Sequence, residues 1–211
     1  MYWVETYNDD SLRSSLTPPS SLVAVFNSLG SLAEKGLLDE PEPDANLTAL
    51  GGFVGSLGVD LRVGRVVGLG VQLDVAAAAC MLAAAMSAQA PWRVASPLVH
   101  KDPDEYNYLM TSSFLSKTKF DAGIYSQPIS LVRLLLKYRK EKARAKNPGE
   151  YTNKFVQNNS LAHKRLHLLV KVYENLLSKV ERLVGKPVVD DSVPDPAKDP
   201  GEERRGANDE G

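Results

Sequence analysis

Residues 47–67 have the sequence LTALGGFVGSLGVDLRVGRVV, an apolar run that five glycines interrupt. Each glycine inside a helix costs up to about 1 kcal/mol relative to alanine. Thr48 and Asp60 belong to the residue types that cap helix N-termini, and each precedes a largely apolar segment. The stretch therefore predicts two short helices whose backbones approach neighbours closely at the glycines, which are Gly51, Gly52, Gly55, Gly58 and Gly64.

The chain on both sides of this stretch also has the spacing of helices. Thr17 followed by two prolines predicts the start of a helix, which Gly36 ends. Asp74 is placed to cap the alanine-rich run at 75–86, and small alanine side chains let neighbouring helices approach closely. Pro103 predicts the start of another helix, with a loop expected at 116–128.

Two segments nearer the C-terminus carry amphipathic patterns. In residues 129–144, the apolar side chains of Ile129, Val132 and Leu136 are expected to point inward, with cations on another stripe. Residues 161–184 place apolar side chains on one face at helical spacing: Leu166, Leu169, Tyr173, Leu176, Val180 and Leu183. No strand pattern supports a doubly wound sheet, so the sequence predicts a mainly α-helical fold, a multi-helix bundle.

The composition indicates an ordinary globular protein. The 211 residues include 43% apolar and 24% charged side chains, with one cysteine, Cys80. A single cysteine excludes an internal disulfide framework, and apolar neighbours predict a buried thiol rather than a nucleophile. No secretory signal is visible, and the longest apolar run, 75–86, is too short to span a bilayer. We therefore expect an intracellular, soluble protein without a membrane partner, in the cytoplasm, nucleus or mitochondrion.

The net charge of −1 conceals a strong asymmetry along the chain. Residues 1–116 have a net charge of −7, residues 117–186 a net charge of +11, and residues 187–211 a net charge of −5. A block as basic as 117–186 can attract polyanions. The residues after 187 are mostly Pro, Asp, Glu and Gly with few apolar side chains, which predicts a disordered acidic tail.

A search for catalytic motifs finds none. Gly-Leu-Gly at 68–70 lacks the rest of a dinucleotide fingerprint, and no Gly-x-x-x-x-Gly-Lys-Ser/Thr loop is present. His163 and His167 have the one-turn spacing of a zinc-protease helix, but Lys164 stands where that mechanism needs a glutamate base. No third ligand is evident. We therefore predict no catalytic, cofactor-binding or metal-binding residue.

Cations recur at three- and four-residue spacing in 129–144, namely Arg133, Lys137, Lys140 and Arg144. This stripe has two interpretations: a solvated helix face whose long stems cover apolar surface, or a surface that contacts nucleic acid. Further cations follow at Lys154, Lys164, Arg165 and Lys171, together with the amides Gln157, Asn158 and Asn159. Because such groups bind phosphates, sugars and base edges, they favour nucleic acid, although no aromatic ladder indicates base stacking.

Five segments form an ordered set. They are TPPSSLVAVFNSLGSLAEKGLLDE at 17–40, positions within 47–65, AAAMSAQAPW at 83–92, YSQPISLVRLLLKY at 125–138 and KFVQNNSLAHKRL at 154–166. Within 47–65 the matching residues are Leu47, Thr48, Leu50, Gly51, Leu57, Val59, Asp60, Arg62, Gly64 and Arg65. The set resembles the C-terminal helicase-associated region of DEAH-box RNA helicases, in which a winged helix precedes a helical ratchet domain. Gly58 and Leu61 replace prolines of that family, Gln127-Pro128 replace an Asp-His pair, and Ser160 replaces an aromatic residue.

The resemblance implies a domain organisation and a function. It implies a poorly defined lead at 1–16, a partial winged-helix segment at 17–46, a ratchet domain at 47–186 and a tail at 187–211. It implies a fragment or shortened relative of an RNA helicase that grips single-stranded RNA. The ATP and Mg²⁺ of the family belong to RecA-like domains, of which this sequence has no part, so we expect no cofactor here and no ATP hydrolysis by this chain alone.

If the chain is such an RNA-binding module, we expect seven residues to contact RNA: Arg133, Lys137, Lys154, Asn158, Asn159, Lys164 and Arg165. The helicase core is a further possible partner. The alternative is a protein–protein interaction adaptor that kept the helicase-associated fold without the motor, with the basic block facing an acidic protein.

Overall fold

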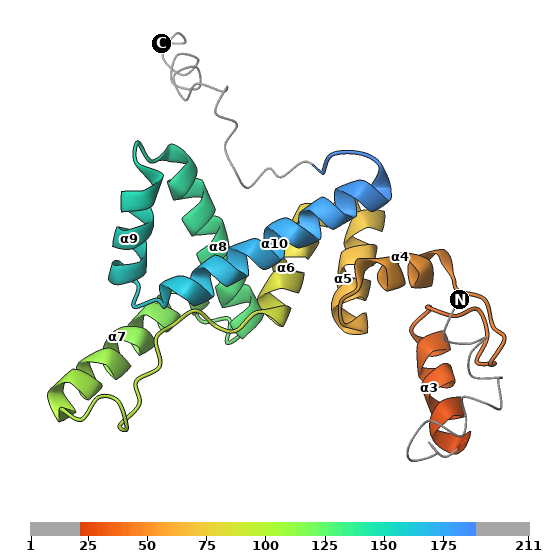
Figure 1. The fold of residues 1–211 in the computed structure, drawn as a ribbon, viewed down its shortest axis with the longest axis horizontal. Coiled ribbons are helices and arrows are strands. Elements are labelled where there is room, and N and C mark those ends of the chain that lie inside the picture. Colours follow the sequence, from red (N-terminus) through yellow and green to blue (C-terminus); the bar gives the residue numbers. More distant parts are fainter. Residues whose placement is uncertain (1–21, 189–211) are drawn as a thin grey trace, which may run out of the picture. The chain divides into compact units, whose positions relative to one another are not determined.

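The computed structural model describes residues 22–188, and within them it contains eight α-helices and two isolated β-bridges (Figure 1). The predicted mainly α-helical fold is confirmed. The expected lead at 1–16, the helix start at Thr17 and the tail beyond Val188 lie outside the described residues. The chain divides into two compact units, residues 1–69 and 70–211, and the expected boundary at 46–47 falls inside the first of them.

The first unit contains α3 (Leu22–Glu34), α4 (Ala49–Leu57) and most of α5 (Leu61–Gln72). Thr48 caps α4 as predicted, because its Oγ1 accepts the backbone N–H of Gly51 at 2.9 Å and donates to the carbonyl of Gly36 at 2.7 Å. Asp60 likewise accepts the N–H of Arg62 at 2.9 Å. An antiparallel bridge between Leu38 and Leu47 closes the connection from α3 to α4.

The glycines of residues 47–67 divide into two groups. A Cβ at Gly51 would overlap the carbonyl oxygen of Leu37, and a Cβ at Gly64 would press on the side chain of Val54, so the predicted close packing is confirmed at these two positions. It is wrong at Gly52 and Gly55, where a Cβ would meet nothing within 4 Å. Gly58 has another role, since it ends α4 in the left-handed conformation with φ 62°.

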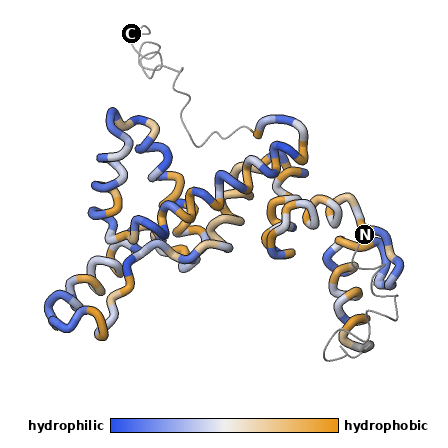
Figure 2. The backbone as a smooth tube through the Cα atoms, viewed as in Figure 1, coloured by the Kyte–Doolittle hydropathy of each residue, from blue (hydrophilic) through white to orange (hydrophobic). Residues whose placement is uncertain are grey.

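The second unit contains α6 (Ala76–Ser87), α7 (Pro103–Asp121), α8 (Gln127–Arg144), α9 (Pro148–Asn158) and α10 (His163–Val184). Helix α6 packs against both α8 and α10, while α7 and α9 pack against α8 (Figure 1). Small buried side chains of α6, among them Ala83 and Ala84, let its neighbours approach closely. Polar and apolar residues alternate along α10 (Figure 2), and its predicted inward face is buried from Leu166 to Val180.

Four local predictions are wrong. Leu183 is 44% exposed, next to the last residue of α10. Asp74 does not cap α6, whose N-cap is Val75 and has no side-chain bond. It ends α5 instead, at φ 56°, where its N–H and that of Val75 bond the carbonyls of Val71 and Gly70 in a Schellman arrangement.

The other two corrections concern α7 and α8. The loop expected at 116–128 is shorter, because α7 continues to Asp121 and buries Phe120. The buried face of α8 is formed by Leu131, Leu134, Leu135 and Tyr138, whereas Ile129, Val132 and Leu136 are only half-buried. Of these three, Val132 does pack against the buried core as predicted. The stripe of apolar residues is wider than one face, and contacts with three neighbouring helices decide which part of it is covered.

Candidate nucleic-acid interface

An aromatic cluster holds together the paired helices α8 and α9, which carry four of the predicted contact residues: Arg133, Lys137, Lys154 and Asn158. The rings of Tyr138 and Phe155 have centroids 5.3 Å apart, and those of Tyr151 and Phe155 lie 5.7 Å apart. A hydrogen bond of 3.1 Å joins the hydroxyl groups of Tyr138 and Thr152. Aromatic pairs of this kind add to the free energy of burial, so the positions of α8 and α9 relative to each other are well fixed.

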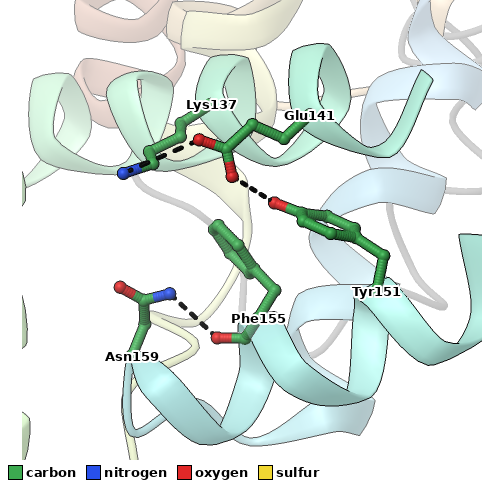
Figure 3. A network of polar contacts seen from close by, with 5 residues as sticks. All are labelled: Lys137, Glu141, Tyr151, Phe155 and Asn159. Carbon is green, nitrogen blue, oxygen red and sulfur yellow. Dashed lines mark hydrogen bonds and ion pairs between the residues drawn. The ribbon is translucent and has the colours of Figure 1, made fainter. Parts of the chain in front are cut away.

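Lys137 lies at the edge of this cluster (Figure 3), with its Nζ 3.8 Å from Oε1 of Glu141. The other oxygen of Glu141 accepts a hydrogen bond of 2.6 Å from the hydroxyl of Tyr151. Burial, assisted by the neighbouring carboxylate, raises the pKa of Tyr151. Tyr151 therefore keeps its proton at neutral pH and binds Glu141, which is shared between the tyrosine and the exposed lysine.

Lys154 and Asn158 are exposed one turn apart on α9. Nζ of Lys154 lies 2.7 Å from Oε1 of Glu150, and this hydrogen bond and the positive charge lower the pKa of the Glu150 carboxyl. Because both side chains of the pair are mostly exposed, water screens the attraction. A phosphate group can therefore replace the carboxylate at little cost.

Three of the predicted contact residues form hydrogen bonds inside the fold. Nη1 of Arg133 donates to the carbonyl of Asp121 at 2.9 Å, at the C-terminus of α7. Asn159 is buried, and its Nδ2 donates to the carbonyl of Phe155 at 2.8 Å (Figure 3). Nη1 of Arg165 donates to the carbonyl of Trp92 at 3.4 Å. These three side chains position helices. The two arginines use only part of their guanidinium groups in doing so.

A backbone junction places the start of α10 beside the segment that follows α6. Trp92 and Leu161 form an isolated antiparallel bridge, supported by a bond of 2.9 Å from the N–H of Arg93 to the carbonyl of Ser160. The hydroxyl of Ser116 accepts from Nε1 of Trp92 at 3.2 Å and donates to the carbonyl of Asn159 at 2.7 Å. The junction is therefore buried and satisfied in its hydrogen bonds.

Through this junction the structure brings Arg93 next to Arg165, a neighbour that sequence reasoning missed. No motif or periodicity links the two residues, because the bridge between Trp92 and Leu161 depends on tertiary packing. The exposed side chain of Lys164 belongs to the same first turn of α10. The predicted residues thus fall into an α8–α9 group and a group at the start of α10.

The remaining reactive side chains singled out from the sequence are one cysteine and two histidines. Cys80 is fully buried, and burial raises the pKa of its thiol to about 12, so it stays protonated at neutral pH. His163 and His167 are exposed on α10. Among residues 22–188, no three His, Cys, Asp or Glu side chains are grouped closely enough to hold a metal ion.

Comparison with known proteins does not assign the chain to a family, since no protein-family model matches it and no curated protein is significantly similar to it. Within the described part of the chain, no helix combines the length and the apolar character needed to cross a membrane.

Proposed function

We propose that the chain is an RNA-binding module that holds single-stranded RNA on the basic surface of its second unit. The observation that carries the proposal is the exposure of cations on three consecutive helices, represented by Lys137 on α8, Lys154 on α9 and Lys164 on α10. In the described structure, the ion pairs of these three lysines are those of Lys137 with Glu141 and of Lys154 with Glu150. Both pairs are exposed, so phosphate can replace the carboxylates. The resemblance to the helicase-associated region of DEAH-box helicases gives the proposal its context: RNA is gripped here while ATP-driven domains move it.

The proposal is tested by charge reversal in the full chain. Lys154→Glu combined with Lys164→Glu changes the charge of the proposed surface, and Arg62→Glu combined with Lys186→Glu makes the same change at exposed positions outside it. Affinity for a fluorescent single-stranded RNA should fall at least about tenfold for the first pair, because phosphate contacts are lost. The control pair should change it far less.

Two results would contradict the proposal: no binding of single-stranded RNA by the unmodified chain at low salt, or equal losses in both double variants. Circular dichroism of each variant checks that the helices are retained.

A protein–protein interaction adaptor is the second candidate, and the exposed apolar side chains of α7 favour it. Tyr108, Phe114 and Leu115 are all largely exposed on this helix. Tyr108 and Leu115 lie two turns apart on the same side of the helix, and exposed apolar patches mark surfaces that bind other proteins. The adaptor is favoured if reversal of Lys154 and Lys164 leaves RNA affinity unchanged but breaks a complex with an acidic protein.

A further inference from the structure

A recess of about 350 Å³ lies where the segment after α6 meets the start of α10. Its lining includes four ionisable residues, Arg93, His100, Glu105 and Arg165. Apolar residues such as Val94 and Leu109 form most of the rest of the wall. It is distinct from the α8–α9 group of cations. Two guanidinium groups thus line one open hollow, and two positive charges so placed attract an anion together.

Each arginine is held by a backbone carbonyl of the segment that carries the other arginine. Nε of Arg93 donates to the carbonyl of Leu161 at 3.1 Å, and Nη1 of Arg165 donates to the carbonyl of Trp92 at 3.4 Å. Because residues 92 and 161 are paired in a bridge, these two bonds fix the arginines on either side of one junction. Each guanidinium carries five N–H donors, so one anchoring bond leaves it able to bind a phosphate.

The charges around the recess favour an anion over a cation. The acidic group is Glu105, whose Oε1 lies 3.4 Å from Nδ1 of His100. Helix α10 begins at the recess without a side-chain N-cap and without an acidic residue in its first turn. The partial positive charge of that helix end therefore adds to that of Arg93 and Arg165.

We infer that this recess binds one backbone phosphate group of single-stranded RNA, with Arg93 and Arg165 as its ligands. The inference rests on the proposed function and adds to it a defined phosphate subsite, together with a ligand, Arg93, that lies outside the basic block of the sequence. A phosphodiester fits because planar guanidinium groups bind phosphate oxygens in pairs, and because neighbouring phosphates of the same strand can continue toward Lys164.

The test compares three variants of the full chain in RNA-binding titrations over a range of salt concentrations. Arg93→Met and Arg165→Met remove a guanidinium but keep an apolar stem. Arg182→Met is the matched control, since this exposed arginine on α10 also donates to a backbone carbonyl, that of Ser178, at 3.3 Å. Loss of one phosphate contact should reduce the slope of log K against log salt by about 0.7 in magnitude. We expect this change for Arg93→Met and Arg165→Met, and none for Arg182→Met.

Two further variants keep the test decisive if an arginine variant fails to fold. Arg93→Lys restores the charge, so it should recover part of the affinity that Arg93→Met loses. Glu105→Gln removes the acidic group of the recess without breaking any backbone contact, and it should tighten RNA binding. Unchanged affinity in Glu105→Gln would contradict the inference.

The outcomes also separate the inference from the proposed function. If the chain binds RNA but Arg93→Met and Arg165→Met behave like Arg182→Met, the subsite is wrong and the proposed function stands. If no RNA binds, both fail. Titration with inorganic phosphate at constant ionic strength tests whether the recess instead binds a free anion. If the recess binds inorganic phosphate but the affinity for RNA does not depend on Arg93, the assignment to RNA is wrong.

Discussion

At the residue scale, the glycines of 47–67 have different roles that their spacing does not reveal. Gly51 lies where the backbone of Leu37 crosses, and Gly64 lies against Val54, whereas Gly55 is exposed with open space around it. Glycine is therefore required by the close contact at Gly51 and Gly64, despite its cost in a helix, but not at Gly55.

Alanine substitutions should separate these roles. Gly51→Ala is expected to lower the free energy of unfolding by about 1–3 kcal/mol, because the new Cβ would overlap the carbonyl oxygen of Leu37. The matched variant Gly55→Ala is expected to raise it by about 0.5–1 kcal/mol. Urea denaturation of both variants measures the difference. Equal effects at the two positions would show that the close approach at Gly51 is not real.

At the element scale, reciprocal hydrogen bonds join the end of α7 to the turn before α8 and to α8 itself. The carboxylate of Asp121, the last residue of α7, accepts the backbone N–H groups of Tyr125 and Ser126 at 3.0 and 3.1 Å and the hydroxyl of Ser130 at 3.0 Å. In return, Arg133 of α8 donates to the carbonyl of Asp121. These bonds hold the turn that includes Tyr125 at φ 56°, a conformation that side chains rarely adopt.

This arrangement predicts a dependence of stability on pH. The pKa of Asp121 lies below its ordinary value of 3.8, mainly because the N–H of Tyr125 donates to the carboxylate. The stabilisation is therefore fully present above that ordinary value and is lost as pH falls through the lower pKa of the folded state. Asp121→Ala should thus be less stable than the unmodified chain at pH 6, and the difference should shrink toward pH 3.

Thermal unfolding at several pH values measures this difference, with Asp44→Ala at an exposed position as the control. A difference between Asp121→Ala and the unmodified chain that stays constant from pH 6 to pH 3 would argue that the ionised carboxylate does not hold the turn between α7 and α8.

The helices themselves could largely be predicted from the sequence, because caps and periodicity are local. Thr48, Asp60 and Pro103 begin helices where expected. The role of Asp74 could not be decided from the sequence, because aspartate can cap a helix N-terminus and can also adopt the left-handed conformation that ends a helix. The buried face of α8 could not be fixed either, because its apolar stripe is wide and contacts with other helices decide what is covered.

At the scale of the whole molecule, charge is distributed unevenly along the chain. The block 117–186 has a net charge of +11 and contains α8, α9 and α10. Its composition was enough to predict a basic surface, and Lys154 and Lys164 are exposed on it. Sequence could not separate them from Arg133 and Asn159, which bond within the fold. It also could not find Arg93, which lies beside Arg165 only because of the bridge at Trp92.

The most direct measurement of the central claim is the affinity of the full chain for single-stranded RNA between about 50 and 200 mM salt. Several phosphate contacts predict a slope of log K against log salt of about −2 or steeper, which is a loss of at least about tenfold over this range. Fluorescence anisotropy with a labelled oligonucleotide gives this slope. An affinity that does not change with salt, or no binding at 50 mM, would contradict RNA binding by the basic surface.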